Sequence, residues 1–483
     1  MTAGVSEPGT GWARHVRRPA RAVVTRLRAL DRASRPADSE TQAALAARWR
    51  ELPEHARTPA QMLGRKTTGC EATHGVFPAC DFGCRPCYHA ANANRVGVDG
   101  SHTVTEVERQ MAYLRERRGP GQYAQLIGGE VSLLPAHAHA EALEAMRRYG
   151  RFPTSFTHGD FDYTYLEQIA LRPDGTPRFE VLSFAVHIDS TMYGRRGAVR
   201  PAGEAELHEH RRRFKELFER LEREHGVRAH LAHNMTVTPG NVGEVADVVQ
   251  VCRELGYRMC SFQPAAFVGD ERRWGPDYRA LTDDAVWEEV ERGVGTRLPY
   301  RALQMGDTRC NRVTWGVWAG DQYCPVLDDT DPRDLRARDA FLRVLPGNLL
   351  FASRSLATVR IARALLAHPG AVPVALAWAT RFARGAGLRA LVSAQPTTYV
   401  MHSFMDARDV GPAWDLLQRG VAATDRRLRA TQERLQACAY GMAHPERDEI
   451  VPACVQHSVL DEQENARLVT MLPTQRGRSL RRA

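Results

Sequence analysis

Lysine is nearly missing from this 483-residue chain, because only Lys66 and Lys215 are lysines among its 66 basic residues. Together with the many alanines, this bias is typical of GC-rich codon usage. The formal charge of +9 therefore does not by itself predict a nucleic-acid partner, and a zinc-binding, nucleic-acid-associated protein is a remote alternative. With 43% apolar and 25% charged residues, the composition excludes a predominantly disordered protein and a small disulfide-stapled scaffold.

Long apolar runs are also missing. The longest candidate, 371–380, is shorter than the roughly 18–20 residues of a membrane-spanning helix and is followed at once by Arg381. The N-terminus lacks the apolar core of a signal peptide, so we expect a cytoplasmic protein, peripheral at the membrane at most. Thiols stay reduced in that compartment, and a tight group of cysteines there predicts a metal-binding or catalytic site rather than disulfides.

Short apolar runs alternate with amphipathic stretches between about residues 67 and 269. This alternation predicts βα units and a parallel sheet. The expected strands are 124–127, 154–157, 181–188, 228–236 and 258–267, and the expected helices are 103–117, 137–149, 204–225 and 241–255. We therefore predict an α/β fold, a partial or complete (β/α) barrel, with its chemistry at the carboxyl ends of the strands.

The most informative motif is a loop with three cysteines, Cys80, Cys84 and Cys87. Gly83 and Pro86 favour a bend between them, so three thiolates can surround one inorganic core. Structural zinc usually has four protein ligands in two closely spaced pairs, whereas iron–sulfur clusters are normally held by cysteine thiolates. Three thiols therefore favour a [4Fe–4S] cluster with one iron left open, and zinc with His89 as its fourth ligand is the alternative.

A second motif, Gly128-Gly129-Glu130, stands at the end of the first strand expected after this loop. Glycines there let another group approach the backbone closely. The Glu130 carboxylate is suited to accept hydrogen bonds from an ammonium group. A lone Gly-Gly-Glu is weak evidence, but its place on the strand after the cysteine loop makes it informative.

These two motifs together resemble the radical S-adenosylmethionine enzymes over about residues 67–269. The resemblance implies that the three cysteines bind a [4Fe–4S] cluster, whose open iron takes the amino and carboxylate groups of S-adenosylmethionine. It implies cofactor contacts for Gly128, Gly129 and Glu130, and, at later strand ends, for Asp189 and Asn234. The family usually has an aromatic residue just before the third cysteine; here Pro86 stands there, and the next residue after Cys87, Tyr88, is the aromatic candidate for cofactor contact.

The activity that this resemblance implies is reductive cleavage of S-adenosylmethionine to methionine and a 5′-deoxyadenosyl radical, which takes hydrogen from an unactivated C–H bond. The cofactor supplies the chemistry, while the protein places the target bond and excludes water. An electron donor such as flavodoxin or ferredoxin is implied as a partner.

Four later cysteines form two pairs, Cys310 with Cys324 and Cys438 with Cys454. Each pair flanks a stretch typical of a β-hairpin, so we expect two hairpins that offer four sulfurs. The expectation is a second, auxiliary iron–sulfur cluster; a zinc site and four unconnected thiols are the alternatives.

Residues 341–405 contain no Asp or Glu but seven arginines. This pattern predicts basic amphipathic helices on an anionic membrane surface, or helices packed on the barrel with their arginines in water. Segments 262–264, 401–406 and 451–454 are similar to archaeal tetraether lipid synthases, which implies a lipid chain as the substrate. A peptide- or cofactor-modifying radical S-adenosylmethionine maturase is the alternative.

The expected organisation has five parts. They are a basic helical arm (1–66), the radical S-adenosylmethionine barrel (67–270), an auxiliary cysteine segment (271–335), a basic amphipathic helical region (336–405) and a C-terminal auxiliary-cluster segment with its tail (406–483).

Overall fold

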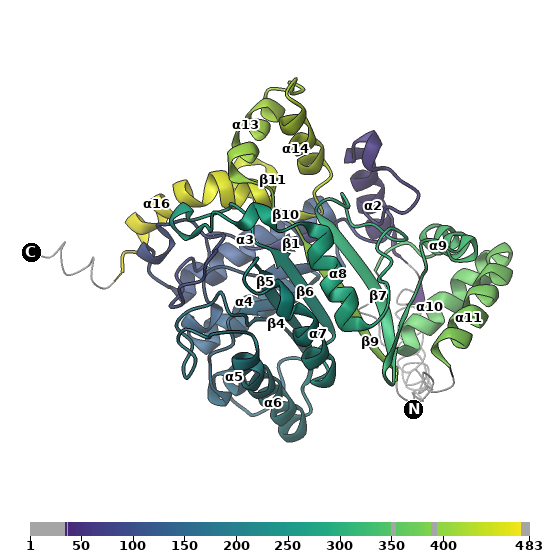
Figure 1. Cartoon of the computed structure of the whole chain (residues 1–483), viewed down its shortest axis with the longest axis horizontal. Helices are drawn as coiled ribbons and strands as arrows, with labels where there is room; N and C mark the ends of the chain where they lie inside the picture. Colours follow the sequence, from purple (N-terminus) through teal and green to yellow (C-terminus); the bar gives the residue numbers. More distant parts are fainter. Residues whose placement is uncertain (1–33, 36, 349–353, 388–393, 475–483) are drawn as a thin grey trace, which may run out of the picture.

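The computed structural model describes residues 34–35, 37–348, 354–387 and 394–474. Its centre is an eleven-stranded sheet with the order β11-β10-β1-β2-β3-β4-β5-β6-β9-β7-β8 (Figure 1). The strands are β1 Cys70–Ala72, β2 Gln122–Leu126, β3 Arg151–Thr157, β4 Val181–His187, β5 Arg228–Val237, β6 Met259–Pro264, β7 Asn311–Ala319, β8 Gln322–Pro325, β9 Ala394–His402, β10 Tyr440–His444 and β11 Glu449–Pro452. From β10 through β9 neighbouring strands pair in parallel, and antiparallel pairs extend both edges. The predicted α/β fold with a partial barrel is confirmed.

The helices around this sheet are α2 Ser39–Glu51, α3 Gly100–Arg118, α4 Ala136–Arg148, α5 Tyr163–Ala170, α6 His208–His225, α7 Val245–Glu254, α8 Asp283–Val294, α9 Pro332–Val344, α10 Arg354–Ala367, α11 Val372–Ala386, α13 Ala407–Gln418, α14 Arg426–Gln436, α15 Ala453–Val455 and α16 Asp461–Met471. Those from α3 to α8 cover one face of the sheet, which we call the outer face. The main core lies between α3–α8 and the outward side chains of the strands, such as Phe184, Met235 and Phe262. In Figure 1, α13 with α14 and α9 with α10 and α11 form two lobes beyond the sheet.

The opposite, inner face of the sheet carries a smaller apolar cluster. Ala72, Ile127 and Met442 contribute to it from the strand region, and Phe404 and Ala453 from the C-terminal part. Side chains along a strand alternate between the two faces, so this face also receives polar residues from the central strands. The C-terminal segments thus close over the inner face, where the predicted chemistry belongs.

The helical expectation for residues 336–405 is wrong at its end, since 394–402 form β9 inside the sheet. Pro396 disfavours a helix there, and the run Thr397 to Val400 consists of β-branched and aromatic residues that suit a strand. β9 pairs with β6 on one side and with β7 on the other, and thereby joins the first hairpin to the barrel.

No single described helix is long and apolar enough to cross a bilayer, whereas one bent pair, Ser355–Ala367 with Pro369–Ala386, meets those criteria only when its two helices are taken together.

A buried ion pair fastens α6 to the carboxyl end of β4. Arg211 and Glu204 are fully buried and bonded to each other, and Arg211 also donates to the Ile188 carbonyl at 2.9 Å. Glu204 accepts a further hydrogen bond from the Ser190 amide at 2.8 Å. The pair therefore fixes the loop after β4, which adjoins the cysteine loop.

Replacing Glu204 with alanine should lower the free energy of unfolding by about 3–5 kcal/mol, because it leaves the Arg211 charge buried without a partner. Urea unfolding of the whole chain measures this loss. Glu209→Ala is the matched control, since the exposed Glu209–Arg212 pair on the same helix should contribute at most about 1 kcal/mol. Equal losses for both variants would contradict the role of burial.

Candidate functional site

The three thiols of the first motif converge at the top of the barrel, in the loop after β1. Burial, together with the neighbouring Cys87 and Cys80 thiols, raises the pKa of Cys84 well above its ordinary value. Burial also raises the pKa of Cys80 to about 12. None of the three forms a disulfide. As neutral thiols they are poor ligands, so a metal centre here would bind with release of protons.

Two neighbouring parts of the barrel hold the cysteine loop in place: the end of β3 and the loop after β4. His158, at the end of β3, bonds Asp81 at 2.9 Å and stacks on the Phe82 ring with centroids 3.8 Å apart. The Gly83 amide donates to the Tyr193 carbonyl at 2.8 Å. These contacts position the segment between Cys80 and Cys84 before any ligand binds.

Gly128 and Gly129 are required for packing against the segment that leads into this loop. A Cβ on Gly129 would lie 1.9 Å from the Ala79 carbonyl oxygen, and one on Gly128 would lie 2.6 Å from the Phe77 ring. The Gly129 amide donates to the Phe77 carbonyl at 2.7 Å, and the Glu130 amide to Ala79 at 2.9 Å. The close approach expected from these glycines is therefore made by the chain itself, and it fixes the Gly-Gly-Glu segment beside the cysteines.

Glu130 joins the ends of β2 and β3. Its carboxylate accepts hydrogen bonds from the Thr157 hydroxyl at 2.6 Å, the His158 amide at 2.8 Å and the Ser132 amide at 2.9 Å. The residue is 1% exposed. The His158 Nε2 atom lies 3.5 Å from the same carboxylate. A carboxylate has about four acceptor positions, so these contacts leave at most one of them open.

Asp189 lies at the end of β4, and both oxygens of its carboxylate already accept hydrogen bonds from neighbouring residues of the chain. Burial would raise its pKa, but His187 and hydrogen bonds from Thr191 and the Thr236 amide lower that pKa to about 2. This carboxylate therefore stays ionised and orders the ends of β4 and β5.

Asn234 and Tyr88 face the inner side of the barrel. Asn234 pairs with His187 of β4 and Ser261 of β6, and its neighbour Met235 points into the outer core. Tyr88 belongs to the inner apolar cluster, and burial raises the pKa of its phenol well above the ordinary value. Both side chains thus lie on the same face of the sheet as the inner apolar cluster.

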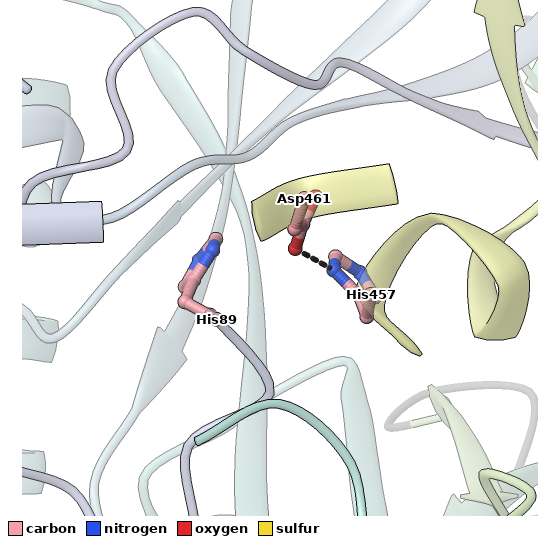
Figure 2. A group of neighbouring side chains, drawn as sticks. All are labelled: His89, His457 and Asp461. Atoms are coloured by element: carbon pink, nitrogen blue, oxygen red, sulfur yellow. Dashed lines mark hydrogen bonds and ion pairs between the residues drawn. The ribbon is translucent and has the colours of Figure 1, made fainter. Parts of the chain in front are cut away.

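A group that sequence reasoning missed lies beside Tyr88. His89, His457 and Asp461 have ligand atoms that all lie within 4.8 Å of one another (Figure 2). His457 bonds Asp461 at 2.8 Å, and its ring lies 4.6 Å from that of Tyr88. His89 bonds the Gly128 carbonyl, and burial lowers its pKa to about 4. His89 therefore groups with the C-terminal residues rather than with the thiols, which disfavours the zinc alternative.

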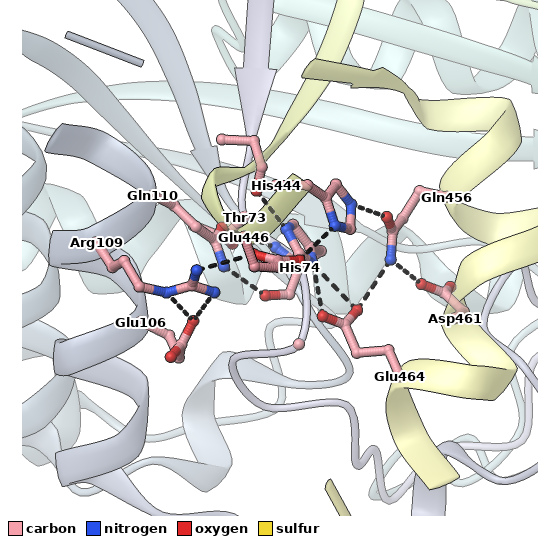
Figure 3. Close-up of polar contacts among 12 residues, drawn as sticks. Thr73, His74, Glu106, Arg109, Gln110, His444, Glu446, Gln456, Asp461 and Glu464 are labelled. Carbon is pink, nitrogen blue, oxygen red and sulfur yellow. Dashed lines mark hydrogen bonds and ion pairs between the residues drawn. The ribbon is translucent and has the colours of Figure 1, made fainter. Parts of the chain in front are cut away.

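A chain of polar contacts holds this C-terminal segment over the barrel (Figure 3). Gln456 donates to Asp461 and to Glu464, both at 2.9 Å, and its carbonyl bonds His444 at 2.6 Å. Glu464 in turn bonds His74 at 2.8 Å. Residues 456–460 form a π-helical turn, a feature frequent at functional sites. The only sequence signal for this arrangement was the spacing of four between His457 and Asp461.

A second group of three thiols lies where the segment before β7 meets the open end of the β10–β11 hairpin. Cys310 precedes β7, and Cys438 and Cys454 stand at the open end of the β10–β11 hairpin. Burial and the thiols of Cys438 and Cys310 raise the pKa of Cys454 to about 12. Arg434 Nε donates to Cys310 Sγ at 3.1 Å. A guanidinium placed this way stabilises a thiolate, as a metal centre requires.

Cys324 is not part of this group, which corrects the expected set of four. It pairs with Val317, seven residues along β7 from Cys310, or roughly 23 Å at about 3.3 Å per residue. There it packs with Ala319 and Ala386. The expectation failed because β8 is short, so that Cys324 lies near the turn of its hairpin instead of at the open end.

Neither group of thiols is arranged for a single metal ion. Among the described residues, the groups whose ligand atoms all lie within 4.8 Å of one another contain none of these cysteines. Sulfurs around one zinc ion lie only about 3.8 Å apart, given Zn–S bonds of about 2.3 Å. The wider spacing leaves room for a polynuclear cluster.

Comparison with known proteins gives no family model and no curated protein that matches this chain. Among solved structures, Streptococcus suis SuiB bound to S-adenosylmethionine is 15% identical to this chain. The match covers 40% of this chain and 40% of SuiB, with a TM-score of 0.27. SuiB bound to its precursor peptide SuiA is 16% identical over 40% and 38% of the two chains, with a TM-score of 0.28. Native anSMEcpe with bound AdoMet is 13% identical over 40% and 50%, also at 0.28. The similarity thus spans at most half of those chains.

Proposed function

We propose that this chain is a radical S-adenosylmethionine enzyme. The observation that carries the proposal is the convergence of Cys80, Cys84 and Cys87, all half-buried in one loop, beside the Gly128–Glu130 segment that is bonded to the chain leading into the same loop. Three thiols suit a [4Fe–4S] cluster with one open iron.

The surrounding residues fit the cofactor that such a cluster needs. Glu130 keeps at most one acceptor position for an ammonium group, and Asn234 offers an amide to a ribose from β5. Tyr88 provides an aromatic wall next to Cys87. When bound, the cluster and S-adenosylmethionine supply a radical able to take hydrogen from an unactivated C–H bond. The chain's part is to bind, to orient and to exclude water.

Water exclusion is the task of the C-terminal segments. Phe404 stacks on Tyr88 with centroids 6.2 Å apart, and Ala453 packs in the same inner cluster. These residues cover the inner face from above, so a target C–H bond would lie in an apolar surrounding without competing hydrogen donors.

The second group of thiols is proposed to hold an auxiliary iron–sulfur cluster. Cys454 lies three residues before His457 in the segment that covers the first site, and the Ser403 amide bonds the Cys310 carbonyl at 2.8 Å. The short segment 403–405 therefore adjoins both centres. This neighbourhood suits electron exchange with the substrate site or with the first cluster.

For the substrate we propose an apolar chain, such as that of a lipid. Ile127, Phe156 and Met442 form an apolar cluster on the inner face together with Tyr88. Untargeted lipid comparison tests this class: a deletion strain should lose a lipid product, and restoring the wild-type gene, but not a Cys84→Ala gene, should bring it back. An unchanged lipid profile with an altered peptide would favour the maturase alternative instead.

The enzymatic core of the proposal is tested separately with purified protein. Under anaerobic conditions, dithionite and S-adenosylmethionine should yield 5′-deoxyadenosine and methionine even without substrate. The absence of both products from iron-replete protein would refute the proposed function.

A further inference from the structure

Helices α10 and α11 form an elbow at the edge of the molecule with an apolar outer side. The two helices are bent by 110° relative to each other, and in Figure 1 they form a lobe beyond the sheet together with α9. Nine large apolar side chains are exposed among the described residues, and four of them, Val359, Ile361, Leu366 and Leu376, belong to this elbow. Leu366 is 84% exposed and Leu376 is 62% exposed.

The side of the elbow that faces the rest of the protein makes packing and polar contacts. Ala364 and Ala371 pack against Val344 and Leu345 at the end of α9. On α11, Trp378 donates to the Val326 carbonyl at 2.8 Å, and Arg381 pairs with Asp334 at 2.7 Å. Within the described part of the chain, Leu366 and Leu376 are therefore left exposed, because the contacts of each helix are made by its other face.

The residues of the elbow itself carry charge of one sign. The elbow lies within residues 341–405, which contain seven arginines and no acidic residue. Arg384 is exposed in the last turn of α11. Arg363 on α10 donates to the Ser34 hydroxyl at 2.7 Å. Exposed apolar side chains among basic residues suit an anionic lipid surface. Firm attachment to such a surface needs both apolar insertion and electrostatic attraction.

We propose that the α10–α11 elbow docks this protein onto anionic phospholipid bilayers, with Leu366 and Leu376 inserted among the lipids. The elbow lies on the surface rather than across the bilayer, because each helix is short and the bend turns the second one away. This proposal goes beyond the proposed function and needs no cluster. It would place the enzyme where an apolar-chain substrate resides.

Co-sedimentation with vesicles tests the docking. Wild-type protein should sediment with vesicles of phosphatidylcholine and phosphatidylglycerol at 7:3 in low salt, and much less at high salt or with phosphatidylcholine alone. The double variant Leu366→Asp, Leu376→Asp should bind the anionic vesicles at least tenfold more weakly. Val421→Asp, Met471→Asp is the matched control: both residues are exposed, at 47% and 66%, but lie outside the elbow.

The outcomes separate docking from the enzymatic proposal. Cys84→Ala should bind vesicles like the wild type, and the elbow variant should keep its far-UV circular dichroism and its cleavage of S-adenosylmethionine in solution. The docking proposal fails if wild-type protein stays in the supernatant at low salt, or if the elbow variant binds within twofold of the control. It fails equally if the elbow variant only changes the oligomeric state, since the elbow would then be a contact between copies of the chain.

Discussion

Replacing Cys84 with alanine should reduce formation of 5′-deoxyadenosine by at least about 100-fold and remove about four irons per chain. The remaining thiols of Cys80 and Cys87 supply only two ligands, which is too few for a cluster whose fourth position must stay open. Chromatographic quantification of 5′-deoxyadenosine and colorimetric iron analysis measure the two effects on the same anaerobic preparation.

Cys324→Ala is the control for this loss. Cys324 is free, like the loop cysteines, but it is buried in the β7–β8 hairpin with Ala319 and Ala386. The control should keep both the iron and the activity. If Cys84→Ala retained its iron while losing activity, Cys84 would have another role than ligation.

Replacing Cys454 with alanine should remove a second set of about four irons and leave the first cluster in place. Cys454 lies close to Cys438 and Cys310, whose thiols raise its pKa together with burial, and Arg434 donates a hydrogen bond to Cys310. Loss of one of three ligands leaves the auxiliary cluster without a stable site. Iron and sulfide analysis, with Mössbauer spectra of the remaining iron, measure the difference from wild type.

This experiment distinguishes the structural grouping from the pairing expected from the sequence. On the sequence expectation, Cys324→Ala and Cys454→Ala would remove the same cluster. On the structure, only Cys454→Ala does so, because Cys324 is roughly 23 Å from Cys310 along the strand. Equal iron loss in both variants would contradict the three-thiol group.

Much of the barrel could be predicted because its signals are local. The expected strand 228–236 is observed as Arg228–Val237, and the expected helix 103–117 as Gly100–Arg118. Apolar residues that recur at the spacing of a helix or a strand, with short turns between them, predict the bounds of such elements to within a few residues. β1 was missed because only three residues, Cys70–Ala72, form it.

The site was only partly predictable, because some of its contacts join residues far apart in sequence. The loop at Cys80–Cys87 and the Gly128–Glu130 segment were recognisable from short motifs. The neighbourhood of His89 and His457, in contrast, depends on how the C-terminal segment closes over the barrel, held by contacts such as that between Glu464 and His74. No local pattern encodes that closure. The glycines show the same limit, since the group that approaches Gly129 is the chain's own Ala79 carbonyl.

Electron paramagnetic resonance of the dithionite-reduced Cys454→Ala variant tests the central claim most directly. This variant retains only the centre at Cys80, Cys84 and Cys87, so its spectrum reports that site alone. The account predicts the signal of one reduced [4Fe–4S] cluster that changes when S-adenosylmethionine is added, as an open iron requires. A colourless protein holding zinc, or a cluster signal indifferent to S-adenosylmethionine, would contradict it.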